Sequence, residues 1–255
     1  MKLGFQRHGD GAETAVVLHE WLGDHKNWDP VVPYLDGKLA SYLFVDLRGY
    51  GLSRNLKGAY DLDETVQDIL ELMDGLGHHR FHVVCHSMSG LVGQYLLQKA
   101  RPRIKSLFAV SPVPPSGFKM DKAAFDRLVS VTDSDASALE AISARTGSRY
   151  AEGWLSRKLA IARSSATRDA MVGYARMFTS SDISEGARGI DTPVRALAGQ
   201  YDIPIYREES VRNHFANVYP RFDLVTCQEA GHYAMLEAPV FTASQIERFI
   251  CSHAD

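Results

Sequence analysis

Short apolar runs rich in valine, leucine and phenylalanine recur along the chain, and stretches with helical periodicity separate them. This alternation constrains the fold most, because parallel strands need a crossover connection between them, which is usually a helix. It predicts an α/β protein with a mostly parallel central sheet flanked by helices. Residues 2–8, followed by Gly-Asp-Gly, are expected to form an edge strand that enters by a hairpin turn. The other strands are expected at residues 14–19, 41–46, 81–85, 104–110, 194–198 and 222–227.

One long stretch interrupts this alternation. Between Pro112 and Ile190 the sequence has helical character and no run that predicts a strand. A doubly wound sheet should resume within a shorter connection, so we expect a helical insertion that covers one face of the molecule. The expected organisation is a core made of residues 1–112 and 191–255, with a small helical cap at residues 113–190.

Composition limits the partners and the compartment. The 255 residues are 45% hydrophobic and carry a formal charge of −3, so nothing in the charge predicts nucleic acid or an anionic membrane as a partner. The three cysteines are few, odd in number and not spaced as metal ligands. The first residues lack the apolar stretch of a signal peptide, and no run approaches the roughly eighteen apolar residues of a membrane-spanning helix. We expect a reduced, soluble, cytoplasmic protein.

Three residues at the carboxyl ends of predicted strands could act together. Ser87 follows the run 81–85, Asp202 follows 194–198, and His232 follows 222–227. Functional groups gather at these strand ends in open α/β sheets. A serine hydroxyl needs a base to take its proton, and that base needs an anion to orient it and to stabilise its charged form. The joint placement predicts a catalytic triad of Ser87, His232 and Asp202.

Other interpretations of these residues exist. Ser87 could cap a helix, since serine is favoured at that position. Asp202 could belong to a turn, and the rival acid Asp182 lies within the helical stretch and not after a strand. The sequence around Ser87 is C-H-S-M-S-G, so Cys85 and Ser89 occupy the glycine positions of G-x-S-x-G. Both are small, and we expect the turn to survive at a modest cost in strain.

Five motifs together resemble the α/β-hydrolase-fold family over nearly the whole chain. The motifs are H-E-W-L-G at residues 19–23, D-L-R-G-Y-G-L-S at 46–53, C-H-S-M-S-G at 85–90, G-Q-Y-D at 199–202 and G-H-Y-A-M-L-E-A-P at 231–239. The stretch A-V-S-P-V-P-P-S-G-F at residues 109–118, together with the short helical insertion, is also similar to the small cofactor-free esterase and haloperoxidase-like members of that family. The resemblance implies a cap inserted after the sixth strand of the family sheet, and an oxyanion hole formed by the backbone N–H groups of Trp21 and Met88.

The resemblance implies a serine hydrolase that cleaves a small, largely apolar carboxylic ester, lactone or thioester through an acyl-enzyme. Water is then the co-substrate, and no cofactor or metal is implied. A carbon–carbon bond hydrolase of the same fold and a slow-turnover ligand receptor are the alternatives. The sequence leaves the oligomeric state open.

Two expectations concern the surroundings of the oxyanion site. Glu20 stands where the family has glycine, and an inward carboxylate would oppose the negative charge that develops there. We therefore expect Glu20 to point away and to pair with Arg48, and to disfavour anionic substrates if it does not. Among the aromatic residues of the helical stretch, Trp154 or Phe178 is expected to reach the substrate pocket.

Overall fold

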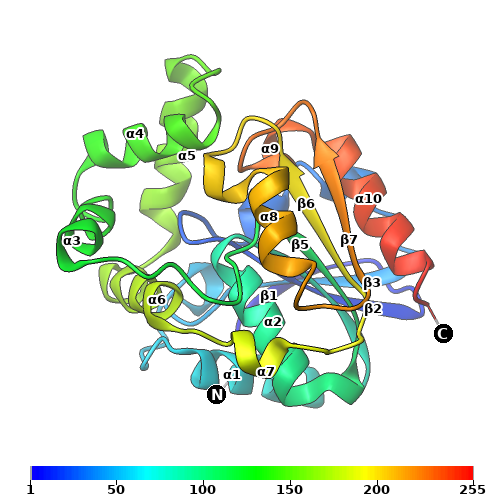
Figure 1. Cartoon of the computed structure of the whole chain (residues 1–255). Helices are drawn as coiled ribbons and strands as arrows, with labels where there is room; N and C mark the ends of the chain where they lie inside the picture. The colour runs from blue at the N-terminus through cyan, green and yellow to red at the C-terminus, as the bar shows by residue number, and fades with distance from the viewer. Residues whose placement is uncertain (1, 255) are drawn as a thin grey trace.

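A seven-stranded sheet forms the centre of the protein, seen here in a computed structural model that describes residues 2–254. The strand order is β1-β3-β2-β4-β5-β6-β7, and every neighbouring pair is parallel except β1 with β3. The mostly parallel sheet predicted from the alternation of runs is confirmed (Figure 1). The strands are β1 (Phe5–His8), β2 (Glu13–Leu18), β3 (Ala40–Val45), β4 (Phe81–His86), β5 (Ile104–Val110), β6 (Val194–Gly199) and β7 (Phe222–Cys227).

The edge strand β1 corrects one expectation. β1 and β2 are consecutive in the chain but form no hairpin, because β3 lies between them and β1 pairs antiparallel with β3, Phe5 opposite Val45. Every residue of β2 is buried, whereas β1 is partly exposed. An apolar strand gains most where neighbours cover both its edges, so β2 takes the inner position and β1 the outer one.

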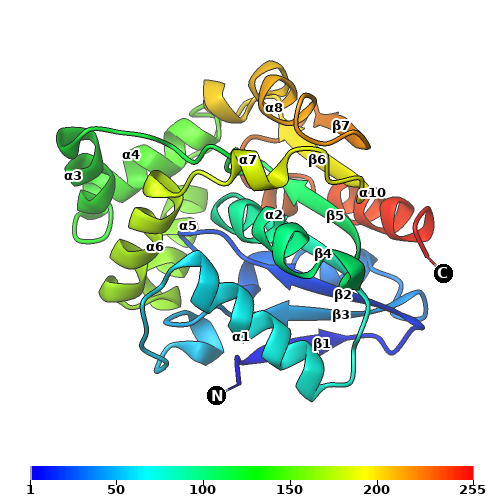
Figure 2. The same ribbon diagram turned by 60° about the horizontal axis from the view of Figure 1, so that its bottom comes forward.

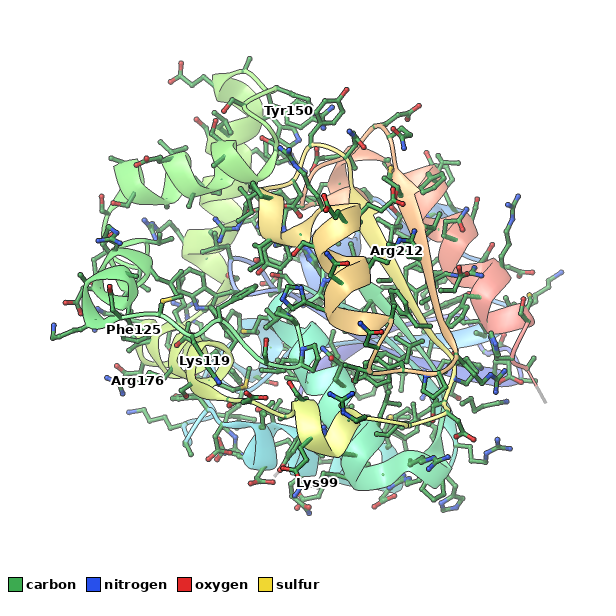
Figure 3. All side chains as sticks on the ribbon, viewed as in Figure 1. Lys99, Lys119, Phe125, Tyr150, Arg176 and Arg212 are labelled. Atoms are coloured by element: carbon green, nitrogen blue, oxygen red, sulfur yellow. The ribbon has the colours of Figure 1, made fainter. Side chains whose placement is uncertain are left out.

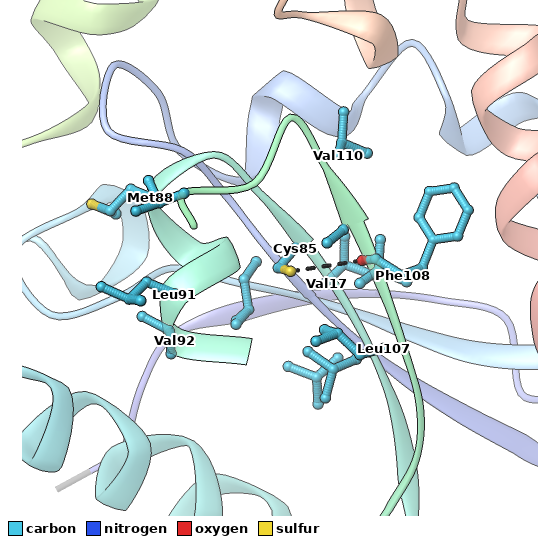
Figure 4. Packing of buried hydrophobic residues seen from close by; sticks show 14 of the residues in the cluster. Val17, Cys85, Met88, Leu91, Val92, Leu107, Phe108 and Val110 are labelled. Atoms are coloured by element: carbon cyan, nitrogen blue, oxygen red, sulfur yellow. Dashed lines mark hydrogen bonds between the residues drawn. The ribbon is translucent and has the colours of Figure 1, made fainter. Parts of the chain in front are cut away.

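Helices cover both faces of the sheet. Cys85 and Leu107 lie against Gly93 of α2, whereas Phe108 contacts Phe249 of α10 with ring centroids 5.9 Å apart. Since successive side chains of a strand point to opposite faces, α2 and α10 lie on opposite sides of the sheet (Figure 4). Figure 2 shows α1 beside α2 on the same face. The helices outside the long connection are α1 (Leu62–Gly75), α2 (Met88–Ala100), α8 (Glu208–Phe215), α9 (Ala234–Glu237) and α10 (Pro239–Cys251).

The connection between β5 and β6 is helical. The structure describes all of this connection, and none of it joins the sheet as a strand. α3 to α6 lie together at one end of the sheet, and α7 lies against α2 (Figures 1 and 2). The helices of this connection are α3 (Lys122–Ser130), α4 (Asp135–Arg145), α5 (Glu152–Ser165), α6 (Arg168–Ser180) and α7 (Ser184–Ala187). We keep the division into a core and a cap of residues 113–190 as a proposal.

Across residues 2–254, no helix combines the length and the apolar character needed to cross a membrane.

Candidate active site

Ser87 stands on a sharp turn between β4 and α2. Its backbone angles are φ 55° and ψ −110°, a region that residues other than glycine rarely adopt. Hydrogen bonds hold the turn: the Ser87 N–H donates to the Val110 carbonyl at 2.9 Å, and the Ser87 carbonyl accepts from Gly90 and Val113 at 2.9 and 3.0 Å. The Ser87 side chain makes no capping hydrogen bond with α2 and lines a cavity. Helix capping therefore does not account for this serine.

Cys85 and Ser89, at the glycine positions of the elbow, fit into the turn. Cys85 is fully buried, and Ser89 Oγ accepts from the His86 N–H at 2.9 Å and donates to the His86 carbonyl at 3.0 Å. The close approach of α2 to the sheet depends instead on Gly93. A Cβ added there would lie 2.8 Å from Leu107 Cδ1 and 3.1 Å from Cys85 Sγ. A glycine needed for packing α2 against the sheet thus lies further along the helix.

Hydrogen bonds fix His232 at three of its atoms. Its Nδ1 lies 2.7 Å from Asp202 Oδ2, its N–H donates to the Arg145 carbonyl at 2.8 Å, and its carbonyl accepts from His86 Nε2 at 2.8 Å. A carboxylate can only accept, so Nδ1 carries the hydrogen and Nε2 is left as the acceptor that a general base needs. Asp202 and His232 are both buried, whereas the rival Asp182 is exposed.

Ser87 and His232 line the same cavity, although among the described residues no direct hydrogen bond joins their side chains. The Tyr206 ring centroid lies 4.6 Å from that of His232, and the Ser87 side chain is near enough to the Tyr206 hydroxyl to influence its pKa. Burial raises the pKa of the Tyr206 phenol and keeps it neutral, although the contact with Ser87 opposes this. Catalytic hydrogen bonds often tighten only when substrate binds, so this geometry is compatible with proton transfer. Our sequence analysis missed Tyr206, whose only signal is its place in the loop after Asp202.

The two expected oxyanion residues lie beside Ser87. Trp21 and Met88 line the cavity, and within the described part of the chain neither backbone N–H donates a hydrogen bond. Met88 begins α2, where the N–H groups of the first turn have no partner inside the helix. Trp21 is held by its Nε1, which donates to the Met171 carbonyl at 2.8 Å, and by its carbonyl, which accepts from the Tyr50 hydroxyl at 2.9 Å. Unpaired N–H groups beside a nucleophile are what an oxyanion hole requires.

Glu20 is buried and belongs to the residues around the cavity, but its carboxylate is bound by groups of which two, Lys158 and Asn27, are outside the lining. Its Oε1 accepts from Lys158 Nζ at 2.8 Å and from Asn27 Nδ2 at 2.9 Å, and its Oε2 accepts from the Leu22 N–H. Lys158, on α5, also donates to the Leu22 carbonyl at 2.6 Å. One lysine of the helical connection therefore holds both the carboxylate and the backbone of the loop that carries Trp21.

The charge of Glu20 is balanced inside the protein. Burial alone would raise the pKa of Glu20, but the Lys158 ammonium and other favourable contacts outweigh burial and lower this pKa to about 2. The pair is neutral as a whole, which reduces the opposition to a developing oxyanion. The expected pairing with Arg48 is wrong, because Arg48 Nη2 lies 2.6 Å from Asp68 Oδ1. Lys158 is far from Glu20 in sequence, so only the folded chain reveals the pair.

A cavity of about 410 Å³ joins these groups. Phe178 lines it as expected, but Trp154 is not part of the lining. The Trp154 ring stacks on Tyr150 at 4.6 Å between centroids and packs on Tyr233 at 6.0 Å. Figure 3 shows Tyr150 near the connection between α4 and α5. The lining comprises Glu20, Trp21, Leu22, Ser87, Met88, Val113, Gly117, Phe118, Lys119, Met120, Leu128, Arg145, Phe178, Ile203, Ile205, Tyr206 and His232.

A cluster of Asp24, His25 and Asp46 has ligand atoms within 4.8 Å of one another. The hydrogen bonds of these three residues indicate that the cluster stabilises the surrounding loops. Asp46 accepts from His25 Nδ1 at 2.6 Å, from the His25 N–H at 2.8 Å and from the Leu52 N–H at 2.8 Å, and Asp24 caps a short helical turn by accepting from the Lys26 N–H. These groups are engaged with each other, and we assign no metal to them.

The comparison with known families agrees with this architecture. Residues 15–206 match the family model described as alpha/beta hydrolase fold. The matched span begins in β2 and includes Ser87 and Asp202. The chain therefore belongs to the α/β-hydrolase-fold family, as its five motifs indicate.

Individual relatives resemble the chain to different extents. A dihydrolipoyllysine-residue acetyltransferase component of the acetoin cleaving system from Cupriavidus necator is 35% identical over 115 residues, which are 44% of this chain and 30% of that protein. The putative carbamate hydrolase RutD of Stutzerimonas stutzeri is 25% identical over 244 residues, 89% of each chain. A thermophilic esterase from Thermogutta terrifontis superposes with a TM-score of 0.84 at 20% identity, covering 99% of this chain and 94% of that one. The likeness to the esterase shows the fold. The chain spans less than half the length of the first curated relatives that it matches, so these relatives do not assign it an activity.

Proposed function

We propose that this chain is a serine hydrolase that cleaves a small carboxylic ester, lactone or thioester through an acyl-enzyme. One observation carries the proposal. Ser87, on a turn with positive φ, lines the same cavity as His232, whose Nδ1 is held by buried Asp202 at 2.7 Å. This combination of nucleophile, base and orienting acid is suited to acyl transfer.

In the proposed mechanism, Ser87 Oγ attacks the carbonyl carbon while His232 Nε2 takes the hydroxyl proton. The tetrahedral oxyanion accepts hydrogen bonds from the N–H groups of Trp21 and Met88. His232 then returns the proton to the leaving oxygen or sulfur, and the acyl group stays on Ser87. Water, deprotonated by His232, attacks the acyl-enzyme and releases the acid. Asp202 orients His232 and stabilises its charged form in both halves of the reaction.

The helical connection supports the same proposal by enclosing the cavity. Leu128 of α3 and Phe178 of α6 contribute apolar walls, and residues 117–120 complete that side. A volume of about 410 Å³ suits a small substrate. We assign residues 113–190 the role of a cap over the site.

Ser87→Ala tests the mechanism. We expect turnover of p-nitrophenyl butyrate to fall at least roughly a thousandfold, because the hydroxyl that forms the acyl-enzyme is removed. Ser252→Ala, an exposed serine at the end of α10, is the control and should keep full activity. A fluorophosphonate probe should label Ser87, as read by peptide mass spectrometry. Retained turnover in Ser87→Ala would refute the proposal, and labelling of Ser87 without turnover would favour a slow receptor.

A further inference from the structure

Arg145 contributes a positive charge to the wall of the cavity and forms no direct ion pair among residues 2–254, although the more distant charges of Asp202 and Glu20 act on it. It is the last residue of α4, and it lines the same cavity as Ser87 and His232. Its Nη1 donates to the Ala141 carbonyl at 3.0 Å. Within residues 2–254, no carboxylate lies within ion-pair distance of its guanidinium. The remaining donors of the guanidinium have no protein acceptor among these residues.

The other charged groups of the lining are already matched. Glu20 is paired with Lys158 at 2.8 Å. Lys119, labelled in Figure 3 on the stretch between β5 and α3, is exposed and lies 3.0 Å from Asp182. His232 is held by Asp202, which belongs to the proposed triad. Among the described residues, this leaves Arg145 as the charged group of a mostly apolar cavity that has no ion-pair partner.

The position of Arg145 is fixed relative to the triad. Its carbonyl accepts from the His232 N–H at 2.8 Å, and a Cβ added to Gly231 would lie 2.3 Å from its carbonyl oxygen. The backbone of Arg145 therefore rests directly on the histidine loop. Its charge also acts on Tyr206, which lines the same cavity as Ser87. The backbone of Arg145 is thus anchored beside the histidine loop, and its guanidinium lies near enough to Tyr206 for its charge to act on the phenol.

We propose that Arg145 binds a carboxylate of the substrate, so that the preferred substrates are esters that carry a second, ionised carboxyl group, such as hemiesters of dicarboxylic acids. The planar guanidinium can hold a carboxylate through two parallel hydrogen bonds. The apolar walls formed by Val113, Leu128 and Phe178 would cover the methylene groups between the two carboxyl carbons. The preference for such ester substrates rests on the proposed function, whereas binding of a carboxylate at Arg145 does not depend on catalysis.

A pair of substrates tests the proposal. The first is the p-nitrophenyl hemiester of glutarate, and the second is the neutral ester in which an isopropyl group replaces its free carboxylate. We expect kcat/KM to favour the hemiester in the parent protein, and we expect Arg145→Gln to lower the ratio of the two kcat/KM values roughly tenfold or more. Arg127→Gln removes the same charge from an exposed position on α3 outside the lining and should leave the ratio within about twofold. An unchanged ratio in Arg145→Gln would overturn the proposal.

Binding separates this proposal from the proposed function. Glutarate should bind the Ser87→Ala protein, measured by calorimetry, and its affinity should fall roughly tenfold or more when Arg145→Gln is added. If neither ester is hydrolysed but glutarate binding depends on Arg145, the proposed function fails and this inference stands. Equal or absent glutarate binding in both proteins would refute the inference alone. Arg145→Lys keeps the positive charge but loses the planar group that can form two parallel hydrogen bonds. It serves as the second variant if Arg145→Gln does not fold.

Discussion

Two buried charged residues, Lys158 and Glu20, link the helical segment between β5 and β6 to the loop that carries Trp21. Lys158 and Glu20 are 1% and 2% exposed, and Lys158 reaches both the Glu20 carboxylate and the Leu22 carbonyl. A buried ion pair of this kind adds little net stability compared with apolar packing, but losing one partner leaves the other charge buried and unpaired. The main effect of the Lys158–Glu20 pair is therefore to fix the position of the loop that carries Trp21.

Lys158→Met should destabilise the fold by roughly 3 to 5 kcal/mol at neutral pH, because Glu20 is left buried without its cation. The double variant Glu20→Gln, Lys158→Met should recover most of that loss. Urea unfolding of the parent, both single variants and the double variant gives the coupling energy of the pair. If the effects of the two substitutions on the free energy of unfolding simply add, Lys158 and Glu20 do not form the coupled ion pair described above.

The same variants should differ in their response to pH. The folded-state pKa of Glu20 is about 2, below its ordinary value of 4.5, so its ionised form stabilises the folded protein above about pH 4.5. This contribution is lost as the pH falls toward 2. The stability difference between the parent and Glu20→Gln should therefore shrink over that range, and a constant difference would argue against ionised Glu20.

Helix α2 is the element that sets the elbow against the sheet. Its first turn follows Ser87 directly, and two glycines let it approach neighbouring chain segments. A Cβ at Gly90 would lie 2.6 Å from Pro112 Cβ and 2.8 Å from Pro112 Cα, so part of the clash is with backbone that follows β5. Packed interiors accommodate such overlap only by shifting the helix or the strand connection.

Gly90→Ala should therefore destabilise the protein by roughly 1 to 3 kcal/mol, despite the better helix propensity of alanine. Gly153→Ala in α5 is the matched control, since a Cβ there has no atom within 4 Å. That change should stabilise the protein by up to about 1 kcal/mol. Thermal unfolding of the two variants measures both effects, and similar shifts in the two would show that α2 does not need the close approach.

The elements themselves were largely predictable. The parallel strands lie where apolar runs predicted them, because a strand buried on both faces must be apolar along its length. The neighbour of β1 was not predictable, because the pairing of an edge strand depends on which strand is left open at the rim of the sheet.

The whole molecule is held together across the division between the sheet and the helical connection. The Arg145 carbonyl accepts a hydrogen bond from the His232 N–H, Lys158 donates to Glu20 of the loop, and Trp21 donates to the Met171 carbonyl. Each contact joins one of α4, α5 and α6 to a loop at the carboxyl ends of the strands. These contacts predict that the connection does not open independently of the sheet.

Hydrogen exchange can check this. The slowest amides of α5 should open with a free energy within roughly 1 kcal/mol of those in β4 and β5, because opening α5 would expose the buried ion pair. In Lys158→Met, protection of α5 should fall while that of β4 and β5 falls less. Low protection of α5 in the parent protein would instead indicate a cap that opens separately.

The sequence by itself determined the sheet, the helices and the placement of Ser87, Asp202 and His232 after the carboxyl ends of strands, because strand periodicity and strand ends are local properties of the chain. Only the tertiary structure decided the partner of Glu20, the exclusion of Trp154 from the cavity, and the place of Arg145 in its wall. These outcomes depend on how α4 and α5 pack over the loops, and contacts between distant parts of the chain leave no pattern in the local sequence.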